Sequence, residues 1–154
     1  MSAEPNLYKL LQVHRDADDT VIRYAYRFLA AQYHPDQEMG NGQLFRQITD
    51  AWLVLSDGGK RATYNQELDR EIDFDPLSQN GHLYKLLQVD SEAHPTILRY
   101  AYRFLAAKYH PDNQDTGNEA EFERLTAAWK VLSDASRRAE YDRTLRAGGP
   151  ENAT

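Results

Sequence analysis

The sequence predicts an all-α protein made of two copies of one small helical domain. Residues 23–36 read RYAYRFLAAQYHPD and residues 99–112 read RYAYRFLAAKYHPD, so the two runs differ only at Gln32 and Lys108. All ten tyrosines and both tryptophans also fall into matched pairs. Apolar residues recur at helical rather than alternating spacing, which favours helices over strands. This repeat overrides the length-based prior that 154 residues form one domain.

The repeat sets the domain boundaries. We expect a first domain over residues 1–70, a linker over 71–81, a second domain over 82–147 and a disordered tail over 148–154. The linker is polar and contains proline and glycine, which favours a connection over a further folded unit. Each domain is near the small end of the sizes that fold around one core.

Each copy is predicted to begin with a helix of about two turns, because Leu7, Leu10 and Leu11 have helical spacing. The second copy repeats the pattern at residues 83–87.

A longer second helix follows in each copy. Asp18 is a suitable N-cap, and Ile22, Ala25 and Leu29 then form one apolar stripe. Pro35 ends the helix, because the residue before a proline is driven out of helical geometry. The second copy has the same stripe, with Pro95 at a first helical position and Pro111 at the end.

The third helix carries Phe45, Ile48, Trp52 and Leu55 on one face. Two long helices joined by a short loop pack most economically as an antiparallel hairpin. The sequence SDGG is expected to end the third helix of the first copy, and a short fourth helix is expected over residues 61–68, repeated at 138–145. The arginines of these last helices are interpreted as a solvated basic face: Arg61, Arg137 and Arg138.

Composition excludes several classes of function. The chain has no cysteine, so disulfides, thiolate metal sites and cysteine nucleophiles are excluded. A net charge of −6 weakens any case for nucleic-acid binding. No apolar stretch approaches the roughly 18–20 residues of a membrane helix, and the N-terminus has no signal-peptide core. We therefore expect a cytoplasmic protein with no membrane or nucleic-acid partner.

Four motifs occur in both halves of the chain. They read LYKLLQV, YHPD, AWLVLSD and KRATYN in the first half, and LYKLLQV, YHPD, AWKVLSD and RRAEYD in the second. Together they resemble the J domain of DnaJ-type co-chaperones, over most of both halves. The resemblance implies two tandem J domains, each an antiparallel helical hairpin with short flanking helices and with His-Pro-Asp (HPD) in the hairpin loop. It also implies a non-enzymatic protein that binds a DnaK-type chaperone ATPase (heat-shock protein 70 family) and promotes its ATP hydrolysis, with no cofactor.

The resemblance further implies that the HPD loop and the basic face of the second helix meet an acidic surface of the ATPase. In the first copy these residues are Arg23, Tyr26, Arg27, His34, Pro35 and Asp36. In the second copy they are Arg99, Tyr102, Arg103, Lys108, His110, Pro111 and Asp112.

Elementary chemistry supports these roles. Proline fixes the backbone, so that histidine and aspartate are presented in one geometry. Aspartate accepts hydrogen bonds or pairs with a cation, and histidine donates or accepts through either nitrogen. His34 and Asp36 could instead form a metal or acid–base pair, but two groups from one loop rarely suffice for either. We expect no metal site and no catalytic residue.

Two departures from the family pattern are repeated in both copies. Gln12 and Gln88 stand where the family usually has a glycine after the first helix. Aromatic residues stand where basic residues are common, and with Ala31 they form a second apolar stripe. These residues are Tyr24, Phe28, Tyr100 and Phe104. They are either extra core packing or the contact that joins the two domains or two copies of the chain.

The first copy has the less favourable charges for an acidic partner, with Gln32 in place of Lys108 and Glu38 after its HPD motif. If only one copy engages the ATPase well, we expect it to be the second. The alternative function is a structural or assembly module that uses the J fold for protein–protein contact or dimerisation, with weak or no ATPase stimulation.

Overall fold

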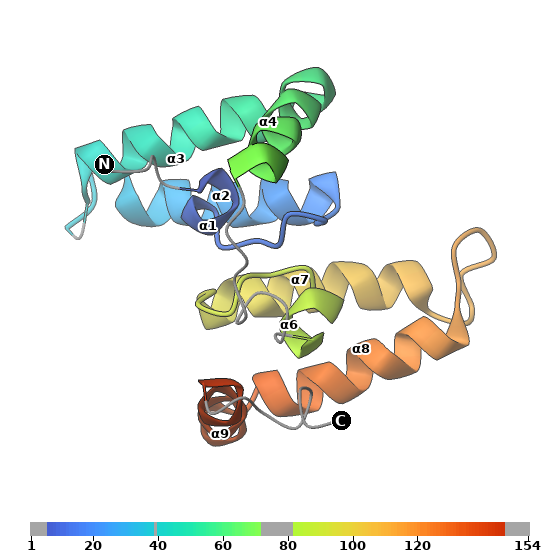
Figure 1. Cartoon of the computed structure of the whole chain (residues 1–154). Coiled ribbons are helices and arrows are strands. Elements are labelled where there is room, and N and C mark those ends of the chain that lie inside the picture. The colour runs from blue at the N-terminus through green and yellow to red at the C-terminus, as the bar shows by residue number, and fades with distance from the viewer. Residues whose placement is uncertain (1–5, 39, 72–81, 147–154) are drawn as a thin grey trace.

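The computed structural model describes residues 6–38, 40–71 and 82–146. The first half contains α1 (Leu7–Leu10), α2 (Asp19–Tyr33), α3 (Gly42–Leu55) and α4 (Gly58–Glu71). The second half repeats them as α6 (His82–Leu86), α7 (Pro95–Tyr109), α8 (Glu119–Leu132) and α9 (Ala135–Arg146). The all-α prediction with two helical hairpins is confirmed, and Figure 1 shows the two units side by side. Most of the predicted linker, 71–81, and the whole predicted tail, 148–154, lie outside the described residues.

The long helices begin and end where the sequence predicts. The Asp18 side chain accepts a hydrogen bond from the Thr20 N–H at the start of α2, and α7 begins at Pro95. Both helices end one residue before the histidine of an HPD motif. The hairpin loops therefore start at fixed points of the sequence.

Each hairpin closes around its predicted stripes. Ile22, Ala25 and Leu29 of α2 are fully buried, as are Ile48 and Leu55 of α3. Full burial of one such aliphatic side chain stabilises a fold by about 1.5–3 kcal/mol. The second hairpin buries the equivalent residues Leu98, Ala101, Leu105, Leu125 and Leu132.

The helices at the ends of each domain differ in length from the prediction. The first helices are shorter, at four and five residues. The last helices are longer, because the carboxylate of Asp57 accepts a hydrogen bond from the Lys60 N–H and starts α4 at Gly58. The glycines that we read as the end of the preceding helix therefore open the next one.

Arg61 and Arg138 are not a solvated basic face, and that interpretation is wrong. The Arg138 guanidinium donates to the Tyr84 hydroxyl at 3.0 Å and to the carbonyls of Ser91 and Ala93 at 3.1 and 2.7 Å. Arg61 makes the equivalent bonds to the Tyr8 hydroxyl and to the carbonyls of Arg15 and Ala17. Each arginine ties the last helix of its domain to the loop before the long helix. Arg137, by contrast, is exposed.

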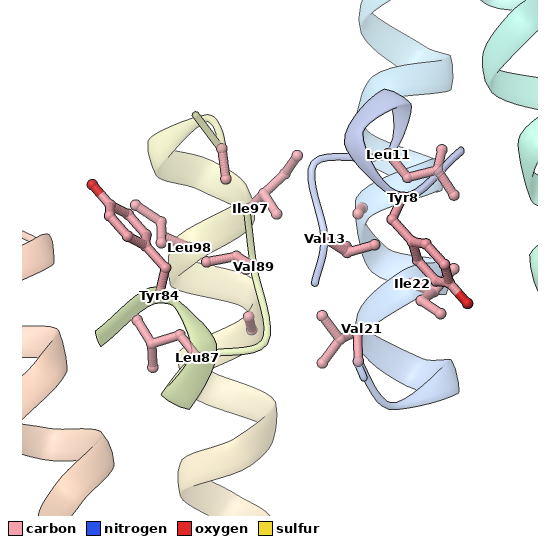
Figure 2. Packing of buried hydrophobic residues seen from close by; sticks show 14 of the residues in the cluster. Tyr8, Leu11, Val13, Val21, Ile22, Tyr84, Leu87, Val89, Ile97 and Leu98 are labelled. Carbon is pink, nitrogen blue, oxygen red and sulfur yellow. The ribbon is translucent and has the colours of Figure 1, made fainter. Parts of the chain in front are cut away.

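The two domains meet along the segments that follow α1 and α6. Val13 and Val89 form an antiparallel bridge, and both are buried. Figure 2 shows them on adjoining faces of the two cores. The His14 N–H donates to the Gln88 carbonyl, and the Asp90 N–H donates to the Gln12 carbonyl, each at 3.1 Å.

The two glutamines that replace the family's glycine are central to this contact. Gln12 and Gln88 have φ angles of 60° and 61°, a left-handed conformation that strains a residue with a side chain. The side-chain oxygen of Gln12 accepts a hydrogen bond from the His94 N–H at 2.6 Å, and that of Gln88 accepts one from the Asp18 N–H at 2.6 Å. These two interdomain bonds use side chains that a glycine would lack.

None of the helices in the described ranges is long and apolar enough to span a membrane.

Candidate functional site

The HPD loops follow α2 and α7 and have the same geometry. His34 lies at the C-cap of α2, and its Nδ1 accepts a hydrogen bond from the Asp36 N–H at 3.1 Å. His110 and Asp112 repeat this bond at 3.1 Å. Because Nδ1 is an acceptor, the hydrogen of the neutral imidazole is on Nε2. Each loop thus offers one imidazole donor in a fixed orientation.

A phenylalanine from the third helix supports each imidazole. The ring centroids of His34 and Phe45 are 5.2 Å apart with the rings edge to face, and those of His110 and Phe122 are also 5.2 Å apart. The side chains of His34 and His110 remain 47% and 49% exposed. The motif's carboxylates are more open, at 90% and 94% exposed. Both tips are therefore accessible to an outside partner.

A glycine lets each loop return closely over its own histidine. A Cβ at Gly40 would lie 2.3 Å from the His34 carbonyl oxygen, and one at Gly117 would lie 2.6 Å from that of His110. Side chains do not fit at such distances. We did not single out these glycines from the sequence, although each directly precedes an asparagine N-cap, which is the signal that could have revealed them.

The predicted basic face divides into exposed arginines and a half-buried tyrosine. Arg23 and Arg27 are exposed on α2. Tyr26 is stacked on Trp52, with ring centroids 5.0 Å apart and planes 7° apart, so much of its ring holds the hairpin together. The second domain repeats this arrangement with Arg99, Arg103 and the stacked pair Tyr102–Trp129.

Side-chain hydrogen bonds of Asn113 and Thr116 hold the second HPD loop. The Asn113 amide donates to the Ala107 carbonyl at 3.3 Å, and its oxygen accepts from the N–H groups of Asp115 and Thr116. The Thr116 hydroxyl donates to the Lys108 carbonyl. Next to this loop lies an open hollow of about 580 Å³ lined by Tyr102, Ala106, Ala107, His110, Asp112, Asn113 and Phe122.

The aromatic residues of the second stripe lie near the contact between α2 and α7. The rings of Tyr24 and Tyr100 are 6.0 Å apart, and the Phe28 ring is 4.7 Å from the ring of His94. Phe28 and Phe104 are partly buried and pack against the core cluster. Tyr24 and Tyr100 remain 36% and 37% exposed, so only part of each ring lies in this contact.

The described residues contain no group of three or more histidine, aspartate or glutamate side chains that could hold a metal ion.

Comparison with known proteins identifies the family of this chain. The family model described as the DnaJ domain matches the chain twice, over residues 6–65 and 82–142. The chain belongs to the DnaJ-domain family. Its two J domains are the two hairpins with their exposed HPD loops.

Among the curated relatives are proteins named chaperone protein DnaJ. The one from Wolbachia sp. subsp. Brugia malayi is 52% identical over 62 residues, which is 39% of this chain and 17% of the relative. The one from Limosilactobacillus fermentum is 48% identical over 66 residues, 42% of this chain and 17% of the relative. The one from Xanthobacter autotrophicus is 42% identical over 67 residues, 42% of this chain and 18% of the relative. The matched part is thus less than a fifth of these relatives. No solved structure matches the chain significantly.

Proposed function

We propose that this protein is a co-chaperone that binds a DnaK-type chaperone and stimulates its ATP hydrolysis through its HPD loops. The observation that carries the proposal is the exposure of both HPD tips, each with an oriented imidazole and an open carboxylate. The relatives named chaperone protein DnaJ support it. The chain acts here as a binding partner and not as the enzyme.

The basic helix face supplies the second half of the proposed contact. Arg23 and Arg27 lie on α2, which ends one residue before His34, so an acidic partner surface can meet the arginines and the tip together. Exposed charges of this kind add orientation and speed of encounter more than affinity. Stimulation then requires that the J domain bind one conformation of the ATPase better than another, because equal affinity for both shifts nothing.

The test is single-turnover ATP hydrolysis by a DnaK-type chaperone with the whole chain. Wild type is expected to accelerate hydrolysis, and the double variant His34→Gln, His110→Gln is expected to lose the acceleration while keeping its thermal stability. A matched control is Arg137→Gln, which changes an exposed residue of α9 away from both tips. A wild type that binds other proteins but gives no acceleration would favour the alternative, an assembly module that uses the J fold for contact.

A further inference from the structure

Lys108 is the residue of the predicted basic face whose surroundings differ from those of the arginines. It lies in the last turn of α7, immediately before the second HPD loop. Its Nζ is 3.2 Å from the Oδ2 atom of Asp18 in the first domain, and the two side chains are only 31% and 28% exposed. Arg99 and Arg103 on the same helix are exposed. The cation nearest in sequence to the second tip is therefore already paired inside the molecule.

Asp18 is held in place from two directions. Its Oδ1 accepts the hydrogen bond from the Thr20 N–H at 2.9 Å, and its own N–H donates to the Gln88 side chain at 2.6 Å. Burial raises the pKa of Asp18, but the bonds from Thr20 and Lys108 outweigh it, so the pKa is below its usual value. The carboxylate is charged at neutral pH and is fixed by the domain contact with its second oxygen on Lys108.

The first domain has no equivalent pair. The repeat places Gln32 at the position of Lys108 and His94 at the position of Asp18. His94 uses its Nδ1 to accept from the Thr96 N–H, and its ring packs against Phe28. The side-chain oxygen of Gln32 is buried without a hydrogen-bond partner. Any restraint on a cation beside the tip thus acts on the second domain.

We propose that Asp18 of the first J domain withholds Lys108 from the chaperone ATPase, so that the pairing of the two domains weakens docking at the second HPD site. Asp18 is a positioning residue that acts through Lys108. The inference rests on the proposed function, because it concerns the same contact with the ATPase.

The test uses chains that carry His34→Gln, so that only the second site reports. In this background Asp18→Asn removes the charge and keeps a good N-cap for α2. A partly exposed ion pair is worth up to about a fivefold change in an equilibrium. The chain concentration that gives half-maximal ATPase stimulation should fall by about two- to fivefold, with the maximal rate unchanged. The gain should vanish when Lys108→Gln is also present.

A transplanted pair gives an independent readout from the first site. In chains that carry His110→Gln, Gln32→Lys adds a cation beside the first tip and should lower the half-maximal concentration. Adding His94→Asp should withdraw that gain by pairing with the new lysine. An unchanged half-maximal concentration for Asp18→Asn, or a decrease that persists without Lys108, overturns the inference while the proposed function stands. Absence of stimulation by every chain overturns the proposed function and this inference with it.

Discussion

In the first J domain a backbone hydrogen bond joins the start of α3 to the end of α2. The Asn41 N–H donates to the Tyr33 carbonyl at 3.0 Å. The second domain has the same bond from Asn118 to Tyr109 at 2.9 Å and adds the side-chain bonds of Asn113 and Thr116. The HPD geometry is nevertheless the same in both. The two copies share the proline, phenylalanine and glycine that surround the motif. The side-chain bonds of the loop behind the second motif come from residues that differ between the copies.

The two loops also point in different directions. Figure 1 shows α2 and α7 running antiparallel, so that the loop between α2 and α3 and the loop between α7 and α8 lie at opposite ends of the molecule. The contact between the domains leaves both tips outside it. Differences between the two sites can therefore be measured one at a time by silencing either tip.

The largest effect is expected on stability, from the arginine that anchors the last helix of each domain. Arg138→Ala leaves the Ser91 and Ala93 carbonyls without their donor and should cost about 3 kcal/mol of unfolding free energy. Arg61→Ala should cost slightly more, because Arg61 also pairs with Asp19 at 3.0 Å, where the second copy has Pro95. Denaturant unfolding of both variants measures the difference, with Arg137→Ala as the exposed control. Equal costs for Arg137 and Arg138 would contradict the anchoring role.

The next effect distinguishes the two tips in the ATPase assay. His110→Gln should reduce stimulation by about tenfold, as expected for a lost hydrogen bond to a charged or strongly polar partner. His34→Gln should reduce it less, because Glu38 follows the first motif and places a like charge near an acidic partner surface. Single-turnover rates at equal chain concentration make the comparison. A greater loss from His34→Gln would reverse the ranking of the two domains.

A smaller effect should come from the loop behind the second tip. Asn113→Ala removes its bond to the Ala107 carbonyl and two bonds from loop N–H groups, all of them exposed. The loosened loop should raise the half-maximal concentration for stimulation by about two- to fivefold, in chains that carry His34→Gln. The matched control is Gln37→Ala in chains that carry His110→Gln, where only the first site contributes. It changes the equivalent exposed position after the first HPD motif. Equal changes in the half-maximal concentration at both positions would show that the side-chain hydrogen bonds do not distinguish the two loops.

The sequence predicted the two helical hairpins well because the signals that begin and end their helices are local. Asp18 and Pro95 mark helix starts, and the prolines of the two HPD motifs mark helix ends, wherever the helix goes next. The apolar stripes of the helices predicted which residues form the core, because burial follows the helical period.

Features that depend on distant contacts could not be predicted in the same way. The role of Arg138 was missed because a charged residue in a basic stretch is usually solvated, and its carbonyl acceptors are more than 40 residues away in sequence. Gln12 and Gln88 were noticed only as departures from the family pattern. Their reciprocal side-chain bonds join residues 70 and 82 positions apart, and these bonds exist only when both domains are paired.

The smallest effect concerns the domain contact, where the first domain has His14 and the second has Asp90 at the equivalent position. The backbone N–H of each residue donates a hydrogen bond to a carbonyl of the other domain. The side chain of each residue accepts a hydrogen bond from the N–H two residues later in its own domain. Burial lowers the pKa of His14 below its usual value, although Asp16 and Asp90 act in the opposite direction. The folded protein therefore binds this proton less readily than the unfolded chain does.

The lowered pKa of His14 makes the folded protein less stable as the solution becomes acidic. The stability that neutral His14 contributes is fully present above the ordinary histidine pKa and is lost as the pH falls below it, since the unfolded chain then takes up the proton first. Asp18, whose pKa is also lowered, loses its contribution only in more acidic solution, as the pH falls from its ordinary carboxyl pKa through the folded value. Thermal unfolding between pH 7.5 and 5.5 should thus show a steeper decline for wild type than for His14→Asn, which keeps an acceptor for the Asp16 N–H but does not titrate. Parallel declines for the two proteins would mean that His14 stays solvated, and the asymmetry between the two sides of the contact would then have no electrostatic consequence.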